Sequence, residues 1–278
     1  METTNGRRDG EAAALPAHLQ SKPIADVFPE TTVMFGDIAG FTEWSSTRDP
    51  SDVFTLLEAL YYEFDTIAKR RRIFKVETIG DCYVAVCGLP NPTTHHYINT
   101  ARFASDCMVK MGKVTKDLES VLGAGTADLG LRVGLHSGPV TAGVLRGEKS
   151  RFQLFGDTMN TASRMESTGL KNQIQVSEAT ANRLMAAGKS MWLQEREGGV
   201  VAKGKGVMKT FLLVTQRLQA SCHSVSTTAS SCSFSEPSVA GEYEEDCAPS
   251  LHESHERPYS FTGNATLNED EFDDNISC

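Results

Sequence analysis

Two stretches of this sequence share one pattern: FGDIAGFT at residues 35–42 and ETIGD at residues 77–81. In each stretch an apolar run is followed by a glycine and a single aspartate. We therefore predict that Asp37 and Asp81 lie at strand ends. Two carboxylates on adjacent strand ends can hold divalent cations, and Mg²⁺ prefers one or two carboxylates together with substrate phosphates. The alternative interpretation is that each aspartate is only a turn residue, because Asp beside Gly is common in turns.

Two further segments carry polar side chains in suggestive positions. GDTMNTASR at residues 156–164 places Asn160 and Arg164 four residues apart, on one face of a predicted helix. VAKGKG at residues 201–206 presents Lys203 between small residues, which allow close approach to a ligand. Arginine and lysine facing a phosphate would stabilise developing negative charge. The alternative for Asn160 and Arg164 is a solvated helix face with Asp157 as a capping residue. The alternative for Lys203 is a basic loop on the surface.

Together, paired carboxylates and an Asn/Arg helix face indicate chemistry on a nucleoside triphosphate. The segment after Asp37 also supplies small residues and backbone N–H groups for phosphate oxygens. No Walker lysine motif occurs, and no GxGxxG follows a predicted strand, so P-loop and Rossmann sites are excluded.

Charge is unevenly distributed along the 278 residues. Residues 218–278 hold twelve acidic residues and one basic residue, whereas the remainder holds 24 acidic and 26 basic residues. The apolar residues of this tail show no periodicity, so it cannot bury enough surface to offset its ordering entropy, and we expect it to be disordered. We also expect residues 1–23 to be flexible, which leaves one folded domain at residues 24–217.

Cysteine usage and hydropathy indicate the compartment. The seven cysteines form no CxxC pair, and their odd number argues against a closed disulfide framework. Cys82 and Cys87 are predicted to be small apolar residues of a strand. The sequence shows no signal peptide and no apolar run approaching 18 residues. We therefore expect a cytoplasmic protein with no membrane span, and no nucleic-acid polymer as a partner.

The order of predicted elements indicates an α+β fold. Apolar spacing predicts helices at residues 50–72, 95–118 (with a continuation to 122 left open) and 177–187, and another that carries Asn160 and Arg164. Gly80 and Asp81 lie in the turn of a predicted hairpin. Strand, helix, strand, strand, helix, strand is typical of helices on one face of a largely antiparallel sheet. Strands are predicted at residues 31–35, 74–78, 82–86, 131–136, 140–145, 152–155, 174–176, 191–195 and 208–214.

These stretches resemble the catalytic domain of class III nucleotidyl cyclases, the family of adenylate and guanylate cyclases. The resemblance covers residues 24–216 and is carried by residues 35–42, 75–83, 131–147 and 151–169. It implies a ferredoxin-like βαββαβ core with extra strands and helices, working as a head-to-tail dimer. In that dimer the metals come from one subunit, and the purine-reading and transition-state groups come from the other. This chain has both sets, so a homodimer would build two equivalent sites.

The resemblance also implies a role for each candidate residue. Asp37 and Asp81, with Ile38 beside them, match the site for two Mg²⁺ or Mn²⁺ ions. Asn160 matches the residue that orients the ribose, Arg164 the residue on the transition-state phosphate, and Lys203 the residue that grips the terminal phosphates. The remaining substrate-binding candidates are Glu77, Gln153, Ile38, Ala39, Gly40, Phe41 and Thr42.

The purine-reading positions depart from both family patterns. Adenine-selective members place lysine where this chain has Glu77, and guanylate cyclases place cysteine where it has Gln153. A carboxylate at Glu77 accepts hydrogen bonds from guanine N1–H and the 2-amino group, whereas adenine N1 is itself an acceptor. Gln153 can donate to guanine O6 or accept from the adenine 6-amino group, so it does not discriminate alone. The expected activity is a guanylate cyclase acting on GTP.

Two alternatives remain at this point. One is an adenylate cyclase that makes cyclic AMP from ATP. The other is a catalytically silent binding or dimerisation module, whose signature would be lost aspartates, asparagine or arginine, and none of these is lost. The expected partners are a second copy of the chain or a related cyclase chain, in intracellular signalling.

Overall fold

The computed structural model describes residues 24–146, 150–202, 206–216 and 218, all of which belong to one compact unit. The predicted flexible segment 1–23, Lys203 and all of the predicted tail except Leu218 lie outside the described residues. Among the helices of the described ranges, none combines the length and the apolar composition needed to cross a bilayer.

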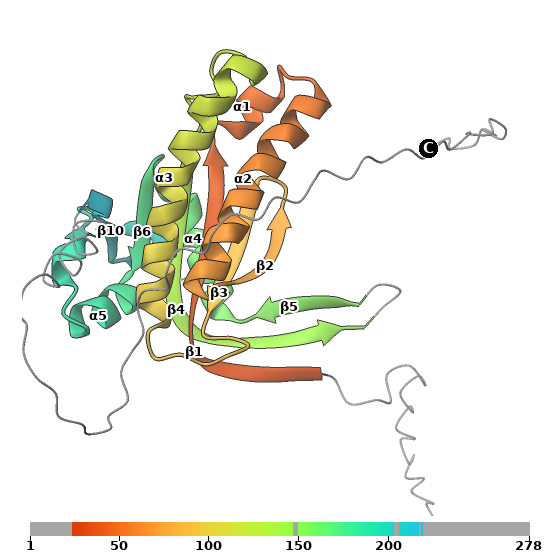
Figure 1. The fold of residues 1–278 in the computed structure, drawn as a ribbon. Helices are drawn as coiled ribbons and strands as arrows, with labels where there is room; N and C mark the ends of the chain where they lie inside the picture. The colour runs from red at the N-terminus through yellow and green to blue at the C-terminus, as the bar shows by residue number, and fades with distance from the viewer. Residues whose placement is uncertain (1–23, 147–149, 203–205, 217, 219–278) are drawn as a thin grey trace, which may run out of the picture. The chain divides into compact units, whose positions relative to one another are not determined.

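The main sheet contains eight strands around a long central strand, β1, and its order is β2-β3-β1-β4-β6-β10-β7, with β5 paired to β4. Its first four strands and the helices α2 and α3 have the order and pairing of a ferredoxin-like βαββαβ core, which confirms the predicted fold class (Figure 1). In chain order the elements are β1 (Ile24–Ala39), α1 (Phe41–Ser45), α2 (Pro50–Arg71), β2 (Phe74–Ile79), β3 (Cys82–Cys87), α3 (His96–Leu122), β4 (Gly130–Leu145), β5 (Arg151–Phe155), α4 (Asp157–Ser167), β6 (Gln173–Ser177), α5 (Glu178–Ala186), the 3₁₀ helix η2 (Ser190–Trp192), β7 (Leu193–Glu195), β8 (Val200–Ala202), β9 (Gly206–Met208) and β10 (Thr210–Leu213).

Alternation along β1 separates two hydrophobic clusters, because successive strand residues point to opposite faces. Met34 and Ile38 belong to the larger cluster, which also contains residues of α2, α3 and α5. Val33 and Phe35 belong to the smaller cluster, which contains Ala162 of α4. The helices therefore cover both faces of the sheet, and the expectation that they lie on one face was wrong for α4.

The long helices follow the sequence pattern closely. α2 begins at Pro50, after an N-cap residue, Asp49, with an extended backbone. Proline is favoured at this position because its missing N–H has no partner in the first turn. The helix ends where Arg72 adopts a left-handed conformation, with φ of 55°. Its buried residues recur at helical spacing, as Leu56, Leu60, Phe64 and Ile67.

Two strands are longer than predicted. β1 continues through Gly36 and Asp37 to Ala39, so Asp37 lies inside a strand and not at its end. β4 runs unbroken through Ser137 and Pro139, which lie between two strands predicted separately at residues 131–136 and 140–145. Its partner β1 has a register shift between Phe28 and Thr31, opposite Pro139. A bulge on the neighbouring strand accommodates a proline, which cannot donate to the ladder. α1, β8 and β9 were not predicted.

Helix α4 approaches β4 most closely at Gly134. A Cβ atom at this position would lie 2.0 Å from the backbone nitrogen of Glu166 and 2.6 Å from the carbonyl oxygen of Ala162. Backbone atoms cannot move aside as a flexible side chain can, so glycine is required here for packing.

We expect Gly134→Ala to destabilise the chain by about 3 kcal/mol, because it forces α4 away from the sheet. Gly112→Ala is the matched control: Gly112 lies within α3, and a Cβ atom there meets nothing within 4 Å. That control should gain roughly 0.5–1 kcal/mol from helix propensity. Urea denaturation of both variants measures the difference, and equal stabilities would contradict the close packing of α4.

Candidate active site

The structure brings Asp37 and Asp81 together. Asp37 lies within β1, two residues before the strand ends at Ala39, and Asp81 lies in the Gly80–Asp81 turn that joins β2 to β3, the neighbour of β1. The Asp81 carboxylate accepts a hydrogen bond from the backbone N–H of Ile38. Partial burial and the adjacent negative charge of Asp37 raise the pKa of Asp81. Two like charges held this close favour a bound cation.

Two residues at this site were not predicted from the sequence: Arg132 on β4 and Glu166 on α4. Arg132 Nη2 donates to Asp37 Oδ2 at 2.8 Å, and its Nε donates to Glu166 Oε1 at 2.6 Å. The Glu166 side chain is only 9% exposed, and this burial raises its pKa despite the neighbouring guanidinium. The sequence does contain one signal for this site: Arg132, between Leu131 and Val133, is a single charged residue in an apolar strand.

This ion-pair network lies on the α4 face of the sheet. Arg132 and Gly134 alternate with Leu131, Val133 and Leu135, which belong to the larger cluster on the opposite face. Arg132 therefore links a site carboxylate on β1 to helix α4 at the level of the close contact at Gly134.

Helix α4 presents different residues on its two sides. Asn160 is exposed and Arg164 is partly buried, whereas Glu166 lies against the sheet. At 3.6 residues per turn, Arg164 and Glu166 are separated by about 200° around the helix axis, and Asn160 lies on the Arg164 side. Among the described residues, neither the Asn160 amide nor the Arg164 guanidinium has a hydrogen-bond or ion-pair partner. Within one chain, the Asn/Arg side of α4 points away from Asp37.

The two purine-reading candidates come from strands that approach one another. Phe74 of β2 and Phe152 of β5 meet edge to face, with ring centroids 5.3 Å apart. Glu77 is exposed three residues after Phe74, and Gln153 is partly buried next to Phe152, opposite Gly143 on β4. The described hydrogen bonds include none between Glu77 and Gln153.

The segment that follows Asp37 makes a sharp turn into α1. Gly40 has φ of 92°, a left-handed conformation that favours glycine, and α1 begins at the next residue. Ile38 is buried beneath the turn, whereas Gly40 and Thr42 are exposed. Trp44 of α1 is buried, and its indole N–H donates to Thr126 Oγ1 at 3.1 Å.

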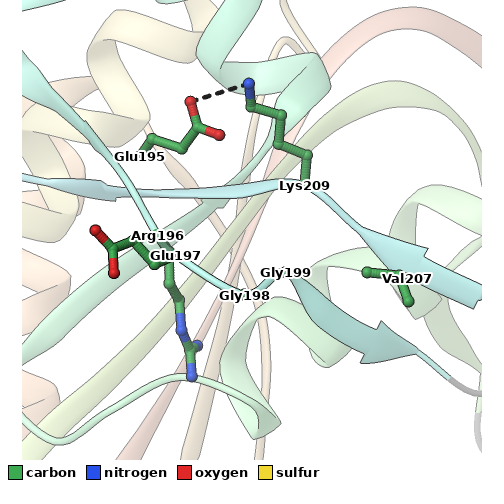
Figure 2. A pocket seen from close by; sticks show the side chains of 7 residues that line it. All are labelled: Glu195, Arg196, Glu197, Gly198, Gly199, Val207 and Lys209. Carbon is green, nitrogen blue, oxygen red and sulfur yellow. Dashed lines mark ion pairs between the residues drawn. The ribbon is translucent and has the colours of Figure 1, made fainter.

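The pocket in Figure 2 contains none of the predicted site residues. It lies beside β7 and β9, and Glu195 pairs with Lys209 across it at 2.9 Å. Its lining is otherwise Arg196, Glu197, Gly198, Gly199 and Val207. The pocket adjoins the β8–β9 hairpin, whose connecting residues 203–205 lie outside the described residues.

The side chains at this site provide only some of the ligands that a hard cation needs. Within the described ranges, His, Cys, Asp and Glu form no group of three or more that could hold a metal ion. Asp37 and Asp81 supply two carboxylates, which matches the preference of Mg²⁺ for few protein ligands completed by substrate phosphates. The residues present therefore fit a cation that arrives with a phosphorylated substrate.

The chain is similar to known proteins over most of its described residues. The sequence model of the "Adenylate and Guanylate cyclase catalytic domain" family matches residues 24–215. "Guanylate cyclase soluble subunit beta-2" of Rattus norvegicus is 34% identical over 243 residues, which are 85% of this chain and 33% of that protein. "Adenylate cyclase" of Mycobacterium bovis is 38% identical over 197 residues, which are 71% of this chain and 42% of that protein. The chain thus spans less than half the length of these relatives.

Solved structures also match. The guanylate cyclase domain of RhGC from Catenaria anguillulae, crystallised in complex with GTP, is 37% identical, with a TM-score of 0.58. The match covers 68% of this chain and 97% of that domain.

We expect Asp81→Asn to stabilise the cation-free chain at pH 7 by roughly 0.5 kcal/mol, a value that allows for screening of a half-exposed carboxylate. Because the pKa of Asp81 is raised, the stability that its protonated form contributes is lost as the pH rises through that pKa. The variant should also lose the thermal stabilisation that Mn²⁺ with nucleotide gives to the unaltered chain. Calorimetry of each chain alone and with Mn²⁺ plus nucleotide measures both effects. If Mn²⁺ with nucleotide stabilises the variant as much as the unaltered chain, the assignment of Asp81 is contradicted.

We expect Arg132→Met to cost about 2–3 kcal/mol, because it leaves Glu166 buried beside the sheet without a partner. Combining it with Glu166→Gln should recover part of this loss, with a coupling of about 1–2 kcal/mol. A double-mutant cycle by urea denaturation measures the coupling. Additive single effects would show that the ion pair contributes nothing.

Proposed function

Because the chain belongs to the family of adenylate and guanylate cyclase catalytic domains, we propose that it converts GTP to 3′,5′-cyclic GMP and pyrophosphate. Two observations support the proposal: the approach of Asp37 to Asp81, and an exposed glutamate, Glu77, at the position that we expect to read the purine. The first suits the triphosphate and its cations, and the second suits guanine. The choice of GTP as the substrate rests on the second observation.

In this proposal each residue acts on one part of the substrate. Asn160 fixes the ribose so that its 3′-oxygen lies in line with the α-phosphorus, and Arg164 stabilises the charge that develops on the α-phosphate. Lys203 holds the β- and γ-phosphates, which leave as pyrophosphate. Asp37 and Asp81 would hold two Mg²⁺ or Mn²⁺ ions, and these ions would make the 3′-hydroxyl more acidic and neutralise the leaving phosphates.

The proposed site contains residues of two chains. Asn160 and Arg164 lie on the side of α4 turned away from Glu166, the residue that Arg132 links to Asp37. A second copy in head-to-tail orientation would bring its Asn/Arg side to the carboxylate pair of the first. Twofold symmetry then gives two equivalent sites. A related cyclase chain with the same groups could replace the second copy, and the proposed setting is cytoplasmic signalling.

An adenylate cyclase is the second candidate, and Gln153 favours it. A glutamine amide can accept from the adenine 6-amino group as well as donate to guanine O6. Against it, Glu77 would face the acceptor N1 of adenine. The bound base would cover this exposed carboxylate and leave it unpaired, at a cost of about 1–3 kcal/mol. Membership of the family is compatible with both substrates.

The substrate is tested by offering GTP and ATP separately to the purified chain with Mn²⁺ or Mg²⁺. We expect cyclic GMP to dominate about ten- to a hundredfold, the factor that one unpaired acceptor provides. Dominant cyclic AMP would assign the chain as an adenylate cyclase. Neither product, from a folded dimer supplied with both metals, would favour the silent binding module.

The two-chain site is tested by mixing two inactive variants. We expect Asp37→Ala and Asn160→Ala each to be inactive alone, because each removes one half of both sites. After random exchange, half of the dimers carry one intact site, so about a quarter of the original activity should return. A mixture of Asp37→Ala with Asp81→Ala is the matched control and should stay inactive. Activity of Asp37→Ala alone would contradict the scheme.

A further inference from the structure

The β2–β3 hairpin has one extra residue on β2. Near the turn, Ile79, Thr78 and Glu77 face Cys82, Tyr83 and Val84, and farther along, Lys75 and Phe74 face Ala85 and Val86. Val76 has no partner, and the register shifts there. This is a β-bulge, a feature that re-aims side chains and often lies beside active sites.

The bulge reverses which residues share a face. In a regular strand, residues two apart point to the same side. Here Lys75 pairs with Ala85 and Glu77 pairs with Val84, so these two side chains lie on opposite faces of the sheet. Phe74 and Glu77, three residues apart, lie on the same face. The packing agrees: Phe74 and Val76 belong to the smaller cluster, and Ala85, opposite Lys75, belongs to the larger one.

Lys75 is anchored on helix α2. Its Nζ lies 2.9 Å from Asp65 Oδ2, and the buried Tyr83 donates to Asp65 Oδ1 at 2.7 Å. The ammonium also lies 5.2 Å from the centroid of the Tyr83 ring and 5.6 Å from that of Tyr61. We call Lys75, Asp65 and Tyr83 the hairpin clamp.

The two ends of β2 impose registers that differ by one residue. The Gly80–Asp81 turn sets the pairs nearest to it, and the Tyr61 hydroxyl donates to the Gly80 carbonyl at 3.0 Å. The hairpin clamp sets the register at Lys75. If the register of the turn continued along the whole strand, Lys75 would face Val86 and leave α2. Phe74 would then also change face and lose Phe152, the neighbour of Gln153.

We propose that the hairpin clamp positions Glu77 for purine selection. By holding the bulge at Val76, it keeps Phe74 against Phe152 and so fixes the strand of Glu77 relative to the strand of Gln153. Lys75 and Asp65 are positioning residues, because they act through the strand and do not contact the base. The inference rests on the proposed purine-reading role of Glu77 and adds what sets its position.

The experiment compares two ion pairs anchored on α2. Lys75 pairs with Asp65 at 2.9 Å, with side chains 34% and 37% exposed, and Lys110 pairs with Glu63 at 3.0 Å, with both 31% exposed. Lys75→Met breaks the first pair, and Lys110→Met, the matched control, breaks the second. Lys75→Arg keeps the charge and is the rescue variant. If Lys75→Met does not fold, Asp65→Asn replaces it, because it retains the shape and an acceptor for Tyr83.

The readout is the ratio of kcat/KM for GTP to that for ATP. We expect Lys75→Met to lower this ratio about tenfold, since misplacing a reacting or reading group by about 1 Å costs up to roughly a hundredfold. Lys110→Met and Lys75→Arg should keep the ratio of the unaltered chain. Hydrogen exchange gives a readout without turnover: the amides of residues 74–77 should exchange about tenfold faster in Lys75→Met than in Lys110→Met.

Glu77→Ala separates the two levels of the proposal. If Glu77→Ala leaves the ratio unchanged, Glu77 does not read the purine, and the proposed function loses its basis for GTP. If Glu77→Ala lowers the ratio and Lys75→Met leaves it unchanged, only the positioning role is overturned. Faster exchange in Lys75→Met with an unchanged ratio also overturns it, because the clamp is then purely structural.

Discussion

The alternation of side chains along β1 is the constraint on which the remaining structure depends. One face of this central strand contributes Met34 and Ile38 to the cluster beneath α2 and α3, and the other contributes Val33 and Phe35 to the cluster beneath α4. Asp37 falls on the α4 face, where Arg132 and Glu166 meet it. The same periodicity that divides the hydrophobic core therefore also selects which helix is tied to the carboxylate pair.

The sequence predicted the helices and the hairpin well, because these depend on local signals. Proline at the start of α2 and the Gly80–Asp81 turn act within a few residues, and the structure places both as expected. The continuous β4 was missed because Pro139 is accommodated by a register shift on β1, more than a hundred residues away in sequence. The extent of β1 was missed for a similar reason: pairing with β4 carries it past Gly36 and Asp37.

The candidate site divides in the same way. Asp37 and Asp81 were predicted from apolar runs that end near glycine, and the structure brings them together. Arg132 and Glu166 were missed because their roles depend on a contact between β4 and α4, which no local pattern shows. The roles of Asn160, Arg164, Glu77 and Gln153 remain predictions, and Lys203 lies outside the described residues.

The opposed sides of α4 have a consequence for how such a protein responds to its own abundance. If the proposed two-chain site is correct, an isolated copy holds only half of each reaction centre, so output follows the population of pairs. Well below the dissociation constant of the pair, that population rises with the square of the chain concentration. Doubling the amount of protein would then raise the output about fourfold, whereas near saturation it would only double. The orientation of α4 would thus make the activity per chain depend on the concentration of the chain itself, before any ligand or regulatory partner binds.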